Sequence, residues 1–307
     1  MNIVAPRGFV YVATGERYRS EAAAAAAQLR RTNPGARICL IADHGKGPVF
    51  WDDLVLLDQP AFGFRDKLAM HLCPYERFLF LDTDTYVVSD LTEVFQLLDH
   101  FDVAGHQLFE GHDYLLPDVP DAFPEFQGGV LAFKRSPSIE NFFAQWLANY
   151  EAFHALNREG HYHYSNVSEQ KALRVTLYHS NLRLAVLGPE FNFIPAHVDF
   201  ACGNVRVFHG RGNLAAFARR MNAQVGNRVH VPPIDSILSA HTLPAELRRA
   251  WWMITLQLLR AATVKSTPLG LRNRLRRNAS IRDWFLRNRF AEANAKTDPK
   301  WQKPVVR

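Results

Sequence analysis

An apolar run, FLFL at residues 78–81, is followed directly by two carboxylates, Asp82 and Asp84. A strand with so little polar alternation is typical of the centre of a parallel sheet that is covered on both faces. Two acids placed two residues apart share one face of a strand, where their like charges repel each other. The pattern therefore predicts a central strand whose carboxyl end faces a cation.

Strand and helix patterns alternate around this run, which predicts the α/β class. Strand, helix and strand in succession favour right-handed crossovers and a parallel sheet. Open α/β sheets bind their ligands at the carboxyl ends of the strands, where Asp82 and Asp84 are expected to lie. The other expected strands are residues 8–14, 36–43, 53–58, 101–106, 127–133, 182–188 and 205–210, and the expected helices are 16–31, 65–73, 89–98, 136–153, 168–180 and 213–224.

The chain has 307 residues, enough for one large domain and a smaller appendage. We predict a domain over residues 1–231 and a helical, basic extension over residues 232–307. From Arg248 onward, arginines alternate with Trp, Leu and Phe and account for much of the net charge of +6. Such a segment either packs its apolar face on the protein or lies on an anionic membrane surface. Nucleic acid ranks third, because no nucleic-acid module accompanies the charge, and it is not an expected partner.

The sequence predicts a cytoplasmic protein, peripheral at the inner face of the membrane if the basic segment binds there. Its start lacks the pattern of a secretory signal, and no apolar run reaches the roughly 18 residues of a membrane span. Cys39, Cys73 and Cys202 have no paired spacing. Neither a disulfide framework nor a zinc site is expected.

The acid pair suits Mg²⁺ or Mn²⁺, which commonly bridge protein carboxylates to substrate phosphates. Taken alone, Asp-x-Asp is also compatible with a solvated turn or a helix cap. The apolar strand in front of it favours the metal site.

The stretch FGFRDKLAMHLCPYERFLFLDTDTYVVSDLTEVF resembles the Asp-x-Asp region of the glycogenin-like sugar transferases, glycosyltransferase family 8, which includes bacterial galactosyltransferases. Further similar pieces follow in the order of the family: GFVYVATGERY, FQGGVLAF, SEQKALRVTLY and VRVFHGRG. The resemblance implies a GT-A type, Rossmann-like fold, with a nucleotide-sugar-binding part over about residues 1–105 and an acceptor part over about 106–231.

The resemblance also implies roles for individual residues. The metal ligands are Asp82, Asp84 and His209, with Mn²⁺ or Mg²⁺ as the cofactor. The nucleotide-sugar, most simply a UDP-sugar, contacts Ala13, Thr14, Tyr18, Arg65, Lys67, Thr83, Gly128, Gly129 and Gly212. The residues beside the reacting sugar are Gln127, Glu169 and Gln170. The acceptor is a carbohydrate, a glycolipid or a protein.

Two departures from the family bear on the donor. The acid of the acidic-Gln pair is Glu169 instead of Asp, which leaves the donor sugar open. The diphosphate lysine expected after Gly212 is missing, and Arg211 is a candidate replacement.

Other readings stay open at this point. His209 could be a buried histidine bonded to backbone, Glu169 a helix cap, the pair Arg65 and Lys67 a solvated helix start, and the two glycines a site of close packing. The family implies retention of the anomeric configuration. Alternatives are an inverting Asp-x-Asp enzyme with Glu169, Asp113 or Asp121 as general base, a non-catalytic binding module, and a metal-dependent phosphohydrolase.

Overall fold

The computed structural model describes residues 3–45, 50–108, 119–158, 168–224 and 226–239. The chain divides into two compact units, Met1–His230 and Val231–Arg307. The strands of the first unit are β1 (Ala5–Ala13), β2 (Ile38–Ala42), β3 (Asp53–Leu56), β4 (Tyr75–Leu81), β5 (Thr85–Val87), β6 (Val103–Gln107), β7 (Phe126–Lys134), β8 (Leu184–Leu187), β9 (Asp199–Ala201), β10 (Val207–His209) and β11 (Arg228–Val231), whose last residue opens the second unit. The helices are α1 (Glu16–Thr32), α2 (Phe64–Lys67), α3 (Thr92–Leu97), α4 (Pro137–Arg158), α5 (Glu169–His179) and α6 (Leu214–Asn222), with 3₁₀ turns η1 (Leu68–Leu72) and η2 (Pro189–Phe191).

The main sheet has seven strands in the order β3-β2-β1-β4-β7-β6-β8. β1 runs parallel to β2 and β4, β2 to β3, and β6 to β8. β7 is antiparallel to both of its neighbours, β4 and β6. The predicted fold class, a mixed and mainly parallel sheet flanked by helices, is confirmed. β4 lies inside the sheet between β1 and β7, as its apolar run predicts.

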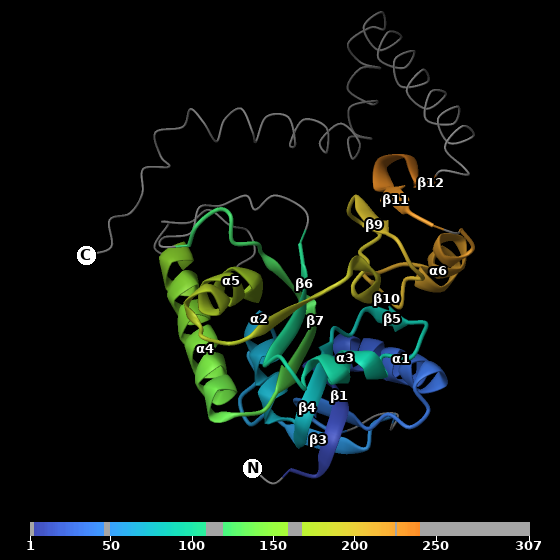
Figure 1. The fold of residues 1–307 in the computed structure, drawn as a ribbon. Coiled ribbons are helices and arrows are strands. Elements are labelled where there is room, and N and C mark those ends of the chain that lie inside the picture. The colour runs from blue at the N-terminus through green and yellow to red at the C-terminus, as the bar shows by residue number, and fades with distance from the viewer. Residues whose placement is uncertain (1–2, 46–49, 109–118, 159–167, 225, 240–307) are drawn as a thin grey trace, which may run out of the picture. The chain divides into compact units, whose positions relative to one another are not determined.

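Helices cover both faces of the sheet (Figure 1), and each face has its own hydrophobic core. On one face, α1 and α3 pack on β1 and β4 through small and aromatic side chains such as Ala25 and Phe95. On the other face, α4 and α5 pack on β4 and β7, with Phe143 against Phe78 and Trp146 against Phe143. Because β4 is buried on both faces, the polar residues that follow Leu81 mark the point where the chain leaves the core.

A short two-stranded sheet lies beyond the end of β4. β5 and β10 are antiparallel, with Thr85 opposite His209. β9 and β11 pair in the same antiparallel way. Sequence patterns did not predict β5, β9 or β11, because three or four residues are too few to show a period.

The predicted helix at residues 65–73 divides into α2 and η1. The helix predicted at 89–98 begins only at Thr92, where Asp90 accepts a hydrogen bond from the Thr92 N–H at 2.9 Å.

The second unit is described only at residues 231–239, where it forms a 3₁₀ turn, η3 (Pro232–Ile234), and the strand β12 (Ser236–Ser239). Residues 232–239 were expected to begin a helical extension, and they form this 3₁₀ turn and strand with no α-helix among them. Pro233 follows Pro232 and a proline disfavours helix at the preceding residue. The remaining basic segment and its predicted membrane contact lie outside the described residues, as does Asp113.

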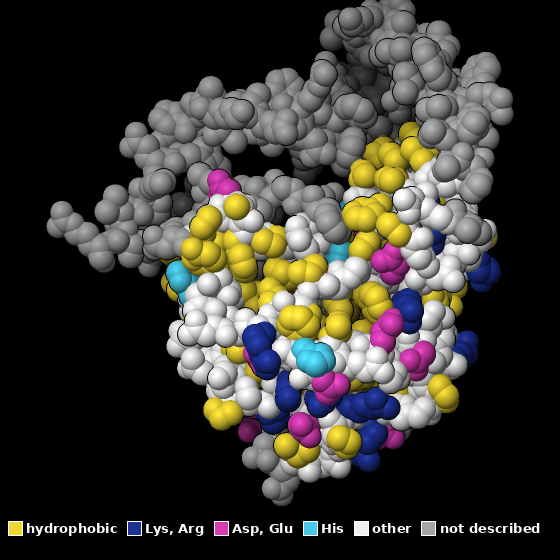
Figure 2. All heavy atoms as spheres, in the orientation of Figure 1, with side chains coloured by type: hydrophobic (Ala, Val, Ile, Leu, Met, Phe, Trp, Pro, Cys, Tyr) yellow, Lys and Arg dark blue, Asp and Glu magenta, His cyan; other side chains and the backbone are white. Residues whose placement is uncertain are grey.

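Among the described residues, no helix is both long and apolar enough to cross a membrane. Figure 2 shows acidic and basic side chains interspersed on the lower part of the face in view. Ion pairs such as Arg37–Asp53 and Arg77–Asp99 occur in the first unit. Because charges of opposite sign lie close together, they limit the long-range electrostatic field of this surface.

Candidate active site

Asp82 and Asp84 follow β4 in a tight turn. The Asp82 N–H donates to the Gly129 carbonyl on β7 at 2.8 Å, and the Asp82 carbonyl accepts bonds from the N–H and the hydroxyl of Thr85 at 3.1 and 2.8 Å. These bonds end the β4–β7 ladder and start β5 in a new direction. The turn places both carboxylates at the carboxyl edge of the sheet, with 19% and 16% of their side chains exposed.

β10 brings His209 to the same edge from a distant part of the chain. Its Nε2 lies 3.4 Å from Asp82 Oδ2 and 3.3 Å from Asp84 Oδ1. One ligand atom from each of the three residues can be chosen so that all lie within 4.8 Å of one another. The three predicted metal ligands therefore form one cluster, and both ring nitrogens of His209 contact side-chain oxygens, unlike those of a histidine whose ring is bonded to backbone.

Without a bound metal, attraction between the two carboxylates and the neighbouring cations determines the protonation states of this cluster. Burial favours the neutral form of Asp82, but Lys67 and His209 outweigh it and lower the pKa of Asp82 to about 2. Burial also raises the pKa of Asp84, but the contact with His209 outweighs it and lowers the pKa below its ordinary value. For His209, burial lowers the pKa, but the two carboxylates outweigh it and raise it to about 9. At neutral pH a proton on His209 therefore separates the two negative charges.

Lys67, at the end of α2, joins the cluster to a further acid. Its Nζ lies 2.9 Å from Asp82 Oδ2 and 2.5 Å from Glu169 Oε1, and 14% of its side chain is exposed. Burial lowers the pKa of Lys67, and the two carboxylates outweigh it and raise it above the ordinary value. Lys67 thus acts as an internal counterion between α5 and the turn after β4, which excludes the reading of a solvated helix start for this residue.

Glu169 is the first residue of α5, and 1% of it is exposed. Its Oε1 receives the bond from Lys67, and its Oε2 is buried without a hydrogen-bond partner. Ser168 is the N-cap residue of this helix, so Glu169 is not the cap. Its predicted place beside the reacting sugar stays a prediction.

Gly128 and Gly129 on β7 make room for two of these side chains. A Cβ on Gly128 would lie 2.6 Å from Glu169 Oε1, and a Cβ on Gly129 would overlap the His209 ring. The neighbouring amides, Gln127 and Gln170, accept bonds from the N–H groups of Gly129 and Gly128 at 2.9 and 3.4 Å. In the described structure, then, the glycines permit close packing of site residues, and their contact with a donor stays a prediction.

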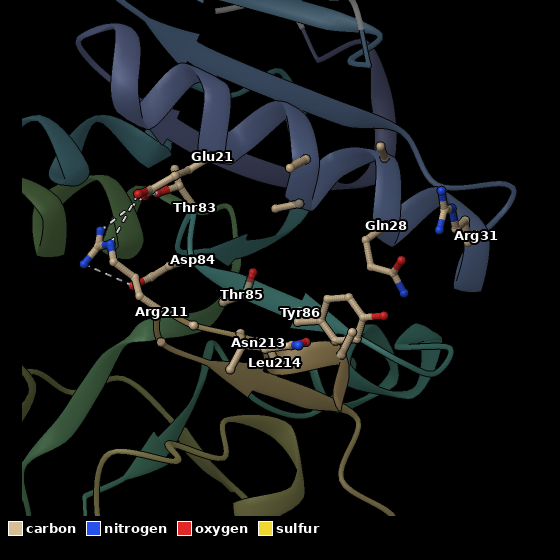
Figure 3. A pocket seen from close by; sticks show the side chains of 16 residues that line it. Glu21, Gln28, Arg31, Thr83, Asp84, Thr85, Tyr86, Arg211, Asn213 and Leu214 are labelled. Carbon is tan, nitrogen blue, oxygen red and sulfur yellow. Dashed lines mark hydrogen bonds and ion pairs between the residues drawn. The ribbon is translucent and has the colours of Figure 1, made fainter. Parts of the chain in front are cut away.

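A pocket of about 710 Å³ opens beside Asp84, between α1, β5 and the loop that precedes α6 (Figure 3). Arg211 crosses one end of it: its guanidinium lies 3.5 Å from Asp84 and 3.2 Å from Glu21 on α1 (Figure 3). Gly210 and Gly212, on either side of Arg211, have φ of 134° and 114°, which favours glycine. Since half of its side chain is exposed, Arg211 is a cation that a ligand in this pocket could reach.

The carboxyl end of β1 carries the residues predicted to bind the nucleoside. Ala13 and Thr14 are buried, while 41% of Tyr18 is exposed. The Thr14 hydroxyl donates to Asp66 at 2.7 Å, and Asp66 also accepts bonds from the N–H groups of Ala61 and Phe62 at 2.7 and 2.8 Å. Asp66 therefore ties this loop to the segment before α2, where Phe62 is held at φ 55°.

Two further residues predicted to contact the nucleotide-sugar, Arg65 and Thr83, bond to acidic side chains in the described structure. Arg65 Nε lies 2.7 Å from Glu151 on α4, in an exposed ion pair. Thr83, between the two acids, donates to Glu21 at 3.1 Å, so its contact with a donor stays a prediction. Sequence reasoning missed Glu21, Asp66 and Asn192. For Asp66 the available signal was an acid between the two basic residues Arg65 and Lys67, and for Asn192 a polar residue between the aromatic residues of EFNFIP.

The cluster fits a divalent cation. Two carboxylates and one imidazole form a donor set common for Mn²⁺, and the carboxylates suit Mg²⁺ as well. Gly129 leaves the space that the His209 ring needs beside the acids. Asp82, Asp84 and His209 are the residues that would hold such an ion.

No protein-family model and no curated protein matches this sequence. Several solved structures are similar to it. The galactosyltransferase LgtC, in complex with donor and acceptor sugar analogues, has 14% sequence identity and a TM-score of 0.49 over 67% of this chain and 87% of that chain. Mouse xyloside xylosyltransferase 1 has 14% identity and a TM-score of 0.45 over 68% of this chain and 99% of that chain. The glycosyltransferase GlyE of Streptococcus pneumoniae has 20% identity and a TM-score of 0.46 over 62% of this chain, which spans about half, 48%, of GlyE. These likenesses concern the fold.

Proposed function

We propose that this protein is a metal-dependent glycosyltransferase of the glycogenin-like family, which moves a sugar from a nucleotide-sugar to an acceptor. The observation that supports this most is the convergence of Asp82, Asp84 and His209 at the carboxyl edge of the sheet, beside an open pocket. In open α/β sheets this edge is where ligands bind. The predicted donor is a UDP-sugar, and the predicted acceptor is a carbohydrate, a glycolipid or a protein.

The reaction needs stabilisation of the negative charge that develops on a departing nucleoside diphosphate. A divalent cation, Mn²⁺ or Mg²⁺, supplies Lewis-acid stabilisation of that charge when bound. Arg211 can add charge-assisted hydrogen bonds to the same oxygens after leaving Glu21, which is why we assign it the role of the missing lysine. Lys67 acts indirectly in this proposal, by holding Asp82 and Glu169 in place.

The sugar-facing side of the proposed site is formed by Gln127, Glu169 and Gln170. An oxocarbenium-like sugar is stabilised by an anionic or amide neighbour on its face. Gln170 is itself oriented by Glu125, which accepts from its amide at 3.0 Å. Retention of the anomeric configuration follows from the family resemblance, and we assign no general base.

The proposal is tested with a panel of nucleotide-sugars, incubated with and without Mn²⁺ and analysed for donor hydrolysis. We expect at least one donor to be hydrolysed to the free sugar and a nucleoside diphosphate only when Mn²⁺ or Mg²⁺ is present. Release of a nucleoside monophosphate or inorganic phosphate would favour a phosphohydrolase instead. Binding without turnover of any donor would favour a non-catalytic module, and an inverted product anomer by NMR would favour an enzyme of another family.

The affinity for Mn²⁺ is expected to rise with pH. The pKa of His209 is raised to about 9 in the metal-free protein, so an ion must displace a proton from it at neutral pH. Mn²⁺ affinity should therefore increase by up to about tenfold per pH unit between about pH 6.5 and 8.5. Titration calorimetry in buffers of different ionisation enthalpy measures both the affinity and the released proton.

The variant His209→Asn serves as the control for this pH effect. It should bind Mn²⁺ more weakly and lose most of the dependence. A flat affinity profile in the unaltered protein would contradict the assignment of His209 as a ligand.

A further inference from the structure

Asn192 lies directly behind His209. It follows η2 and is fully buried, with 0% of its surface exposed. Its side-chain Oδ1 lies 3.0 Å from His209 Nδ1, on the side of the ring opposite to the Nε2 that faces Asp82 and Asp84. The contact joins two segments seventeen positions apart in the sequence.

The chemistry of this contact is directional. An amide oxygen only accepts hydrogen bonds, so His209 Nδ1 must carry a proton to satisfy it. With the proton on Nδ1, Nε2 is the ring nitrogen that faces Asp82 and Asp84 and can serve as a ligand. A ligating histidine is commonly held in this way, with its second ring nitrogen donating to an oxygen.

The His209 ring is confined on a second side by Gly129, because a Cβ at that position would overlap the ring. β10 fixes the backbone of His209 opposite Thr85. Gly129 thus restricts where the ring plane can lie, and Asn192 determines which ring nitrogen faces the acids. If the imidazole were rotated by about 180° about its Cβ–Cγ bond, the buried Asn192 oxygen would lose its hydrogen-bond donor, which is unfavourable.

We propose that Asn192 is a positioning residue for divalent-cation binding, which holds His209 in the Nδ1–H form with Nε2 directed at Asp82 and Asp84. The inference rests on the metal site of the proposed function. It concerns a residue that does not itself touch the ion.

The test compares Mn²⁺ affinity, measured from the electron paramagnetic resonance signal of free Mn²⁺, among four proteins. Asn192→Leu keeps the approximate side-chain volume but removes the acceptor, and it should weaken binding by about 10–100-fold, as the loss of such an outer contact does. Asn192→Asp restores an acceptor for the same proton and should bind within about threefold of the unaltered protein. The matched control is Asn33→Leu, since Asn33 is also buried but bonds to Leu91 and Ser89. It should leave the affinity unchanged.

The ¹⁵N shifts of His209 provide a readout that loss of packing alone does not reproduce. With Mg²⁺ bound at pH 8, we expect Nδ1 to be protonated in the unaltered protein. Equal Mn²⁺ affinity of Asn192→Leu and the unaltered protein would overturn the inference, and so would an Asn192→Asp variant as weak as Asn192→Leu.

If Asn192→Leu does not fold, the protonation state of the Mg²⁺-bound unaltered protein decides, and a proton on Nε2 overturns the inference. Failure of the unaltered protein to bind either ion would instead refute the metal site of the proposed function.

Discussion

Replacing Lys67 by methionine is expected to lower the free energy of unfolding by about 3–5 kcal/mol at neutral pH, which is the usual range for removing one partner from a buried ion pair. Lys67 is 2.9 Å from Asp82 and 2.5 Å from Glu169, and 14% of its side chain is exposed. Without the ammonium group, both carboxylates remain in a poorly solvated site. Denaturant-induced unfolding, followed by circular dichroism, measures the loss.

The pH dependence of this loss has a defined sign. In the unaltered protein the pKa of Asp82 is lowered to about 2, so its contribution to stability is present above its ordinary pKa and lost as pH falls toward 2. In Lys67→Met, Asp82 stays buried but loses the attraction of the ammonium group, so its pKa is expected to rise. Protonation of Asp82 then removes its uncompensated charge at low pH, and the stability difference from the unaltered protein should be smaller at pH 5 than at pH 8.

Two further variants identify the cause of the loss. The double variant Lys67→Met/Glu169→Gln removes one of the abandoned charges and should recover part of the stability. Arg183→Met breaks an exposed pair with Asp102, in which 61% of the arginine side chain is exposed, and should change stability by no more than about 1 kcal/mol. If Lys67→Met lowered the free energy of unfolding as little as Arg183→Met does, Lys67 would not be a buried counterion.

Asp84→Asn is expected to reduce metal-dependent donor turnover by about a thousandfold. Lewis-acid stabilisation is worth several kcal/mol, and each about 1.4 kcal/mol changes a rate tenfold. The amide keeps an oxygen near Arg211 and His209 but not the charge that binds the ion. Initial rates with the hydrolysed donor, measured over a range of Mn²⁺ concentrations, test this expectation.

The control for Asp84→Asn is Asp90→Asn, six positions further along. Asp90 is exposed and bonds to Thr92 at the start of α3, so its substitution should leave turnover unchanged. Turnover that survives in Asp84→Asn, with unchanged dependence on Mn²⁺, would refute the role given to this carboxylate.

The cluster of Asp82, Asp84 and His209 shows which part of the candidate site could be predicted from the sequence and by what means. The apolar run before Asp82 predicted a central strand, and β4 is one because its side chains are buried on both faces. His209 could be added only through resemblance to a family. In the structure it reaches the cluster because β10 pairs with the three-residue strand β5, and strands so short carry no periodic signal.

The surroundings of the cluster were less accessible to prediction. Lys67 was expected to face the donor, which stays a prediction; sequence reasoning did not foresee that Lys67 bonds both to Asp82 and to Glu169, which lies 102 positions further along the chain. Arg65, two residues earlier, turns to Glu151. Both are basic residues of the four-residue helix α2, and only the orientation of that helix makes Lys67 an internal counterion and Arg65 part of an exposed ion pair.

By itself, the sequence determined the fold class and the place of the acid pair. A continuous apolar run and the change to polar residues directly after it are local properties of the chain. The tertiary structure alone decided which partners those acids have: Lys67 on one side, His209 with Asn192 behind it on the other, and Arg211 at the pocket. These contacts depend on strand pairing and helix packing between distant segments. Charge balance and ring orientation at the site are consequences of that packing, and no local pattern encodes them.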